Sequence, residues 1–285
     1  RDMSLMLKAA CRLGIQLVIG SAGGSGADIH LSREIGILRE IAKENALSFR
    51  LATISAEFEK DLLIKEYRCG RISPLGAAPE ITEKDIEDST CIVAQMGVEP
   101  IIAAMDEGAQ VILAGRCYDP ASFAASAIRL GYSKALSIHL GKLLECATIA
   151  AVPGSGSDCM MGYLSEDSFS IEPLNPARRC TTTSVAAHTL YEKSNPYLLP
   201  GPGGILDLSH CEFIQETDRR VKVKGSLYHK ADKNTVKLEG AKQVGYRTIC
   251  VCGNRDPIFI SQVDTILSDL RKRVDENLKD CDSNN

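Results

Sequence analysis

The fold is decided by residues 15–45, which read IQLVIGSAGGSGADIHLSREIGILREIAKEN. Residues 15–19 are a short apolar run that predicts a buried strand, and the apolar spacing within residues 29–45 predicts an amphipathic helix. Between them lies a glycine-rich loop, residues 20–26. A short strand, a glycine-rich turn and a helix in this order are typical of βαβ units in a parallel sheet.

The same alternation of short strands and helices extends outward to about residue 155. Further strands are expected at 49–54 and 110–114. Further helices are expected at 2–13, 57–67, 98–107, 120–130 and 134–151. Parallel strands joined by helices require right-handed crossovers, so this half is predicted to be a parallel βαβ-type sheet with flanking helices.

The second half of the chain has a different pattern. One helix is expected at 182–193 and another after Pro257. Short strands are expected at 160–164, 168–172, 205–208, 212–215, 220–224, 235–239 and 247–252. Alternating apolar and charged residues are typical of antiparallel strands that are solvated on one face. The sequence thus predicts an α/β fold with an α/β domain at 1–155, and a β-rich portion at 156–285 that packs on it and ends in a helix.

Composition argues against several classes of protein. The 285 residues carry a net charge of −4, and aromatic residues make up 5% with no Trp. These values argue against nucleic-acid binding through bulk charge or base stacking. No apolar run reaches the roughly 18 residues that a membrane span needs. The 11 cysteines are scattered and odd in number, so we expect mostly reduced thiols in a cytoplasmic protein without a signal peptide.

The glycine-rich loop is the first place where chemistry is expected. Its backbone can approach a ligand closely, and amide groups that open the following helix favour an anion. Substrate binding is therefore assigned to its small residues, Ser21, Gly23, Gly24, Ser25 and Gly26. The loop has neither the lysine of a P-loop nor a clean dinucleotide fingerprint. Asp28 at the helix mouth is either an N-cap or an acid/base group or metal ligand.

The second place is residues 115–121, GRCYDPA, which again follow a strand and precede a helix. Ligand crevices in open α/β sheets lie at this edge. Arg116 can bind a carboxylate or phosphate with two hydrogen bonds. Asp119 is either the cap of the next helix or a catalytic acid/base. Cys117 is either a nucleophile or, as we favour, an inert buried thiol.

The third and fourth places lie on two later helices. The third carries His139, Lys142, Glu145 and Cys146, where Glu145 is a candidate acid/base group and His139 is either functional or a buried structural histidine. The fourth opens with the hydroxyl and arginine side chains of Arg179, Thr182 and Ser184, which are predicted to bind substrate. His188 follows as the candidate general acid/base, with Glu192 beside it, and an ordinary solvated helix face is the competing interpretation.

Several long stretches resemble one known family. They are GSAGGSGADIHL (20–31), AGRCYDPASFAASAIRLG (114–131), GKLLECATIAAVPG (141–154), RRCTTTSVAAHTLYEKSNPYLLPGPGGILDLS (178–209) and TVKLEGAKQVGYRTI (235–249). Together they resemble the acyclic terpene utilisation AtuA-type family, from the first residues to about residue 255. The family domain is expected to extend beyond this chain at both ends. One departure is visible, because Ala147 stands where the family is expected to have glycine.

The resemblance implies a catabolic setting that involves branched acids, acyl-CoA esters and dicarboxylates, often with a small companion polypeptide. It carries over, by motif, to Gly23, Gly24, Gly26, Arg116, Asp119, Glu145, Arg179, Thr182, Ser184 and His188. No established catalytic role is attached to these positions. The family membership therefore adds a metabolic context to the candidate residues rather than a mechanism.

The function expected from these features is acid–base chemistry of the hydratase or lyase type on a carboxylate or acyl-CoA substrate. His188, Asp119 and Glu145 are the candidate catalytic groups. No redox cofactor is expected, CoA would enter as part of the substrate, and a divalent metal would have to use Asp28 or Asp119. A homo-oligomer is expected, with a small companion subunit in some arrangements. The alternative is a non-catalytic binding or scaffold subunit of a multi-component catabolic enzyme.

Overall fold

The structure is a computed structural model that describes residues 1–191, 195–247, 249 and 251–278. By its internal contacts the chain divides into two compact units, Arg1–Gln243 and a second unit that begins at Val244. The predicted boundary near residue 155 stays a prediction. Each unit is described by itself.

The first unit is built around a parallel three-stranded sheet in the order β1-β4-β2. Its strands are β1 (Leu17–Ile19), β2 (Leu51–Ile54) and β4 (Val111–Ala114). Alternation along the central strand β4 sends Val111 and Leu113 into a core with α1 and α2, whereas Ile112 enters a core with α5 and α6. Helices therefore cover both faces of the sheet, which confirms the predicted α/β class.

The helices of the first unit follow the predicted order, and their bounds differ by a few residues from the expected ones. They are α1 (Asp2–Leu13), α2 (Asp28–Glu44), α3 (Lys60–Arg68), α4 (Glu83–Asp88), α5 (Glu99–Asp106), α6 (Ala121–Arg129), α7 (Lys134–Leu144) and α8 (Thr182–Thr189). Short α4 was not predicted. Glu192, which the sequence pairs with His188, lies outside the described residues.

The later strands form antiparallel sheets, as predicted. One sheet has the order β5-β6-β10-β9 and another has the order β11-β8-β7. Their strands are β5 (Met160–Leu164), β6 (Ser168–Pro173), β7 (Leu198–Gly201), β8 (Gly204–Asp207), β9 (Glu212–Gln215), β10 (Val221–Lys224) and β11 (Leu227–Lys230). Phe169, Ile171, Val221 and Val223 pack from the first of these sheets against α7 and α8. The helices α7 and α8, which carry the third and fourth candidate places, therefore pack on this sheet.

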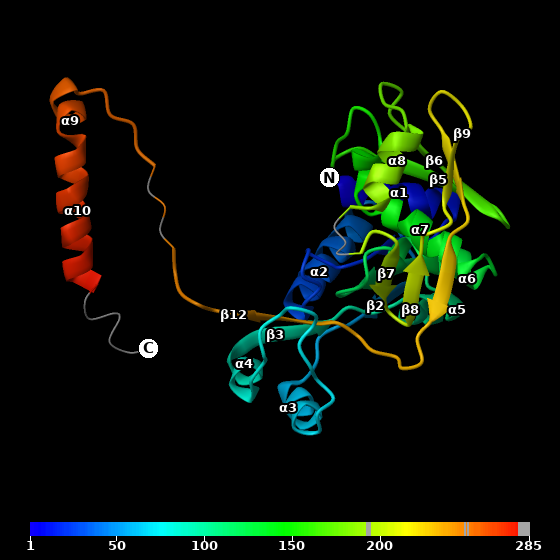
Figure 1. The fold of residues 1–285 in the computed structure, drawn as a ribbon, viewed down its shortest axis with the longest axis horizontal. Coiled ribbons are helices and arrows are strands. Elements are labelled where there is room, and N and C mark those ends of the chain that lie inside the picture. The colour runs from blue at the N-terminus through cyan, green and yellow to red at the C-terminus, as the bar shows by residue number, and fades with distance from the viewer. Residues whose placement is uncertain (192–194, 248, 250, 279–285) are drawn as a thin grey trace. The chain divides into compact units, whose positions relative to one another are not determined.

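A two-stranded ladder joins β3 (Ser89–Ala94) to β12 (Leu238–Lys242), which lie side by side in Figure 1. β3 was not predicted, and β12 begins three residues later than the expected strand 235–239. The described residues of the expected strand 247–252 are not in a strand, and Thr248 and Cys250 lie outside the description. The ladder extends the first unit to residue 243.

The helix expected over residues 134–151 is wrong at its end, since α7 stops at Leu144 and a short 3-10 turn follows at Ala147–Ala150. The break lies at Ala147, whose φ is +53°. That left-handed conformation is costly for a residue with a Cβ and accessible to glycine. It explains physically why glycine is the expected family residue at this position.

Replacing Ala147 with glycine is therefore expected to raise the free energy of unfolding by about 0.5–1 kcal/mol. Relief of the left-handed strain, roughly 1–2 kcal/mol, exceeds the entropy that glycine adds to the unfolded chain. Urea denaturation monitored by circular dichroism measures the difference. An unchanged or lower stability would show that residue 147 is not strained.

The second unit contains α9 (Pro257–Ser261) and α10 (Val263–Leu278). The sequence predicts one helix that presents its apolar stripe to a core. The structure instead ends α9 at Ser261, and neither helix has a buried residue. Leu267, Leu270 and Val274 of α10 are exposed.

In the part of the chain that the structure describes, no helix is both long enough and apolar enough to cross a membrane. The cysteines in this part are free thiols, as expected. Cys250 and Cys281 lie outside it.

Candidate functional site

The first two candidate places meet at the carboxyl ends of β1 and β4. The Ser21 amide donates to the carbonyl oxygen of Gly115 at 3.0 Å, and the Arg116 amide donates to the carbonyl oxygen of Gly26 at 3.2 Å. The contact is so close that a Cβ on Gly26 would lie 2.0 Å from the Arg116 amide nitrogen. Parallel pairing of β1 with β4 brings the two loops to one edge, which the sequence alone left open.

The Arg116 side chain is the centre of this edge and is 13% exposed. Its Nη1 donates to Ser21 Oγ at 3.0 Å and to Asp119 Oδ1 at 2.9 Å. Its Nε donates to Glu239 Oε2 at 2.7 Å, and Nη2 donates to the other oxygen of that carboxylate at 3.4 Å. Arg116 therefore binds a carboxylate with two nitrogens, although the carboxylate belongs to this chain.

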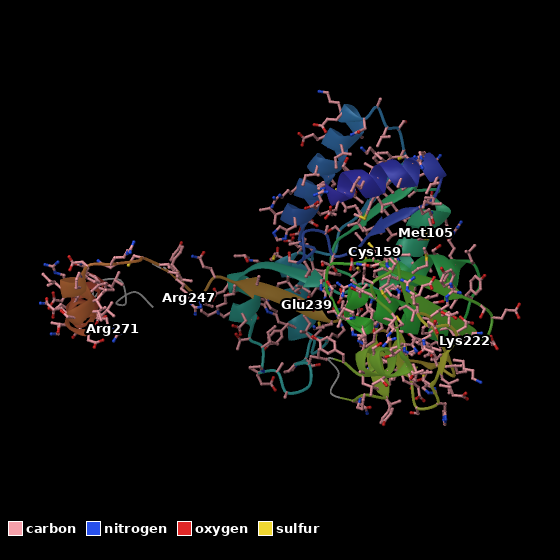
Figure 2. All side chains as sticks on the ribbon, turned by 90° about the horizontal axis from the view of Figure 1, so that it is seen from above. Met105, Cys159, Lys222, Glu239, Arg247 and Arg271 are labelled. Atoms are coloured by element: carbon pink, nitrogen blue, oxygen red, sulfur yellow. The ribbon has the colours of Figure 1, made fainter. Side chains whose placement is uncertain are left out.

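Glu239 lies on β12 (Figure 2). It is paired with Val93 of β3. Lys237 Nζ lies 2.7 Å from its Oε1. The hydrogen bond from Arg116 holds the pKa of Glu239 below its usual range, so the carboxylate is ionised at neutral pH. The sequence analysis missed Glu239 as a site residue. Alternation in 235–239 predicts its strand, but no local signal shows that this strand reaches Arg116.

A pocket of about 370 Å³ opens beside these groups. Its lining consists of Gly24, Ser25, Cys91, Val93, Arg116, Asp119, Glu239, Gly240 and Ala241. The volume falls within the range of small-molecule sites. We call it the Arg116 pocket. One wall is the glycine-rich loop, another is β12, and Arg116 with two carboxylates supplies the charge.

Asp119 does not cap α6, contrary to the capping interpretation of this residue. The cap residue of that helix is Pro120, which makes no side-chain cap hydrogen bond. Asp119 instead pairs with Arg116 and keeps 53% of its side chain exposed. Cys117 is buried, and burial raises the pKa of its thiol, which supports the inert interpretation.

Asp28 is the first residue of α2, and it is not the N-cap, which is Ala27. Its Oδ1 accepts from Ser55 Oγ at 2.6 Å, and its amide donates to Glu57 Oε2 at 2.9 Å. Asp28 lines a different pocket from Arg116. Within the described residues, no group of three or more His, Cys, Asp or Glu side chains is arranged to hold a metal ion.

The third and fourth candidate places meet each other on α7 and α8. His139 is fully buried, with Nδ1 2.8 Å from Ser226 Oγ and Nε2 3.1 Å from Thr189 Oγ1. The ring lies edge-on to Phe169 at 5.1 Å between centroids. Both ring nitrogens thus lie within hydrogen-bonding distance of protein hydroxyls, which favours the structural interpretation of His139 over a functional one.

His139 predicts a specific pH dependence of stability. Burial, with Lys142 nearby, lowers its pKa to about 3, whereas the unfolded histidine titrates near 6.5. Below pH 6.5 the unfolded chain binds a proton that the native chain does not bind. The free energy of unfolding is therefore unaffected by this group above pH 6.5. Below pH 6.5 it falls by roughly 1.4 kcal/mol per pH unit.

Between pH 7 and pH 5 we expect His139 to account for a loss of about 2 kcal/mol in the free energy of unfolding. Urea denaturation at both pH values measures it, with H139Q as the matched variant. H139Q should have a lower free energy of unfolding than the wild-type chain at pH 7. Its free energy of unfolding should also change less between pH 7 and pH 5. An equal pH slope in both proteins would contradict the buried neutral imidazole.

The other predicted residues of these helices have identifiable structural contacts. Ser184 forms a capping box with Thr181 and donates to the Ala150 carbonyl oxygen at 2.8 Å. His188 is buried and stacks on Tyr191 at 5.7 Å between ring centroids. Glu145 pairs with the buried Lys142 at 3.5 Å. None of these residues, nor Arg179 or Thr182, lines the Arg116 pocket, so their predicted roles stay predictions.

Tyr118 is a buried tyrosine whose hydroxyl is affected by carboxylates of both groups of candidate residues. It is 8% exposed, and its burial raises the pKa of its hydroxyl, with smaller contributions from Glu145 and Asp119. Tyr118 follows Arg116 by two residues, while Glu145 follows α7. Both carboxylates therefore add to the effect of burial in disfavouring the ionised form of Tyr118.

A parallel α/β sheet with a glycine-rich loop and a charged pocket at the carboxyl ends of its strands is the arrangement in which α/β proteins typically bind ligands. The chain matches the family described as "Acyclic terpene utilisation family protein AtuA" over residues 1–155 and 171–284. It belongs to that family, as the resemblance predicted. No curated protein and no solved structure matches it. The family description connects the chain to acyclic terpene utilisation.

Proposed function

We propose that the chain is an enzyme that acts on a carboxylate or acyl-CoA substrate in the Arg116 pocket, with acid–base chemistry of the hydratase or lyase type. The observation that carries the proposal is the contact between Arg116 and Glu239. Two guanidinium nitrogens hold a carboxylate within the pocket, at 2.7 and 3.4 Å. A substrate carboxylate of the same geometry can take that position.

The pocket residues divide into an anchoring group and a reacting group. Arg116 anchors the anion. Ser21 positions the Arg116 guanidinium by accepting a hydrogen bond from its Nη1. Gly24 and Ser25 supply the loop wall. Asp119 is the exposed carboxylate beside the anchor and is our candidate general acid/base. A CoA moiety would extend from the pocket as part of the substrate.

Glu239 competes with the substrate in this proposal. Its carboxylate and that of Asp119 balance the charges of Arg116 and Lys237. When a substrate carboxylate binds Arg116, Glu239 has to give up its two hydrogen bonds and keeps Lys237 as its partner. Removing the charge of Glu239 should therefore strengthen substrate binding, whereas removing the charge of Arg116 should weaken it.

Thermal shift measurements test this prediction with dicarboxylates, tricarboxylates, CoA, acyl-CoA esters and nucleotides as probes. A ligand that binds only the folded state raises the melting temperature. We expect carboxylate probes to stabilise the wild-type chain and to stabilise E239Q at lower concentration. R116Q should lose roughly 30-fold in affinity, which corresponds to about 2 kcal/mol for a lost charged contact.

The matched control is R220Q, because Arg220 is also paired with a glutamate, Glu172, but lies outside the pocket. R220Q should respond to the probes as the wild-type chain does. Each shift is taken relative to the same variant without ligand, so a stability change does not count as binding. Equal responses of R116Q and R220Q would contradict the proposed anion site.

A second candidate function is a non-catalytic binding or scaffold subunit. It is favoured by one observation, the exposed apolar side chains of the second unit, among them Tyr246, Val251 and Ile258. Large exposed apolar surface is typical of contacts with another chain. On this proposal the chain forms a homo-oligomer or binds a small companion polypeptide. Light scattering that shows a monomer, together with carboxylate binding, would favour the enzyme.

We also propose that the chain is located in the cytoplasm, whichever of the two functions it has. The free thiols of the described cysteines support it, because reduced cysteines persist in the cytoplasm.

A further inference from the structure

A serine and a histidine form a close pair at the rim of the Arg116 pocket. Ser25 Oγ lies 2.6 Å from His30 Nδ1. Ser25 lines the pocket, and His30 lies in the first turn of α2. The sequence analysis assigned Ser25 to substrate binding and did not consider His30. A histidine five residues after a serine is not a recognisable motif, so only the folded loop shows the pair.

The hydrogen bonds around Ser25 leave its hydroxyl hydrogen available to His30. The Ala27 amide donates to Ser25 Oγ at 3.2 Å, so this oxygen already accepts one hydrogen bond. The hydroxyl hydrogen is then free to donate to His30 Nδ1, which accepts it in the tautomer that carries hydrogen on Nε2. This is the arrangement in which an imidazole removes the proton of a serine.

The packing of the loop holds His30 in place. A Cβ on Gly23 would lie 2.7 Å from the Cβ of His30, so the loop folds directly over the histidine. One residue beyond Ser25, the Gly26 carbonyl oxygen accepts the Arg116 amide. Ser25 and the anion-binding Arg116 therefore line the same pocket, and the histidine contacts this serine from α2.

We propose that Ser25 is a nucleophile activated by His30 and that the pocket takes an acyl group from an ester or thioester. Arg116 in the same pocket favours a substrate with an anionic group. This activity shares the pocket of the proposed function but does not require its hydratase or lyase chemistry.

The reaction balances in two steps. In the first, Ser25 Oγ forms a bond to the carbonyl carbon, its proton passes to His30 Nδ1, and the bond to the alcohol or thiol breaks as that group takes the proton from His30. In the second, water forms a bond to the acyl carbon while His30 takes a water proton. The bond from Oγ to carbon then breaks, and Oγ recovers its proton. The products are a carboxylic acid and an alcohol or thiol.

An uncharged fluorophosphonate probe tests the nucleophile without knowledge of the substrate. Ser25 Oγ would form a bond to phosphorus, fluoride would leave, and the proton would pass to His30. We expect the intact chain to be labelled at Ser25, as located by fragmentation of the peptide that contains residues 13–33. H30Q should slow labelling by roughly 100-fold, the lower end of a general-base contribution.

The matched control is S165A, because Ser165 is an exposed serine that is bonded to Ser168 and not to a histidine. S165A should be labelled at the wild-type rate, and S25A should lose the label. The heat-denatured chain gives the background of unactivated serines. Labelling of Ser25 at that background rate, or at an equal rate in H30Q, would overturn the proposal.

The outcome is distinct from that of the carboxylate screen. The probe is uncharged and reports the nucleophile alone, whereas R116Q and E239Q report the anion site. Labelling without carboxylate binding would leave the serine pair standing and contradict the proposed function. Carboxylate binding without labelling would support the proposed anion site and contradict the proposed nucleophile.

Discussion

Replacing Gly26 with alanine is expected to lower the free energy of unfolding by roughly 3 kcal/mol or more. Two costs combine at this position. Gly26 has φ +68°, in the left-handed region that a side chain disfavours. Its new Cβ would also lie 2.0 Å from the Arg116 amide nitrogen and 2.5 Å from Arg116 Cα. Both are backbone atoms, so no side chain can rotate to make room.

Gly24 provides the matched control within the same loop. Its φ is +93°, but an added Cβ would meet nothing within 4 Å. G24A should therefore cost only the conformational strain, roughly 1–2 kcal/mol. Urea denaturation of both variants measures the difference. If G26A and G24A lose the same stability, the close contact between the loop and Arg116 does not exist in solution.

The G26A variant also links the fold to the site. The carbonyl of Gly26 accepts the Arg116 amide, so a shift of the loop displaces the arginine and the Arg116 pocket together. A folded fraction of G26A should bind carboxylate probes more weakly than G24A, in the thermal shift measurement described above. Gly26 is thus required for the packing of the glycine-rich loop against Arg116, whereas Gly24 lines the Arg116 pocket.

Replacing Lys142 with methionine is expected to cost about 3–5 kcal/mol, the effect of breaking a buried ion pair. The Lys142 side chain is 1% exposed, and its Nζ lies 3.5 Å from Glu145 Oε1, whose side chain is 13% exposed. Methionine keeps most of the apolar length of lysine, so the lost packing is small. The loss comes from removing the buried ammonium group that lies 3.5 Å from the Glu145 carboxylate.

The control is K84M, since Lys84 forms the same kind of helical pair with Asp88 but has a side chain that is 78% exposed. That change should cost no more than about 1 kcal/mol. The double variant K142M/E145Q should recover part of the loss, because it removes the buried charge as well as its partner. Equal losses in K142M and K84M would show that the Lys142 pair is solvated.

The first half of the fold could be predicted from local patterns. The strand at 15–19 corresponds to β1, and the helix at 29–45 corresponds to α2 within one residue at each end. Apolar residues identify these two elements because β1 is a strand of the sheet and one face of α2 packs against that sheet. The helix at 134–151 was predicted too long, because the left-handed residue at its break is an alanine rather than a glycine.

The candidate site was predicted in part. The glycine-rich loop and Arg116 were each placed at a strand end, and the parallel pairing of β1 with β4 brings them together. Glu239 and His30 were missed. Glu239 is 123 residues from Arg116, so its contact depends on the pairing of β12 with β3. His30 depends on how the glycine-rich loop folds back over α2.

Local sequence patterns were enough to predict the α/β class, the glycine-rich loop at a strand end and membership of the AtuA family, because these depend on residues close together in the chain. The charged side chains that contact one another could be identified only in the folded chain. Arg116 contacts Ser21 and Glu239 across separations of 95 and 123 residues. Such contacts are fixed by strand order and register, which local periodicity does not encode. For that reason the chemistry of the pocket could be derived only after the sheets were in place.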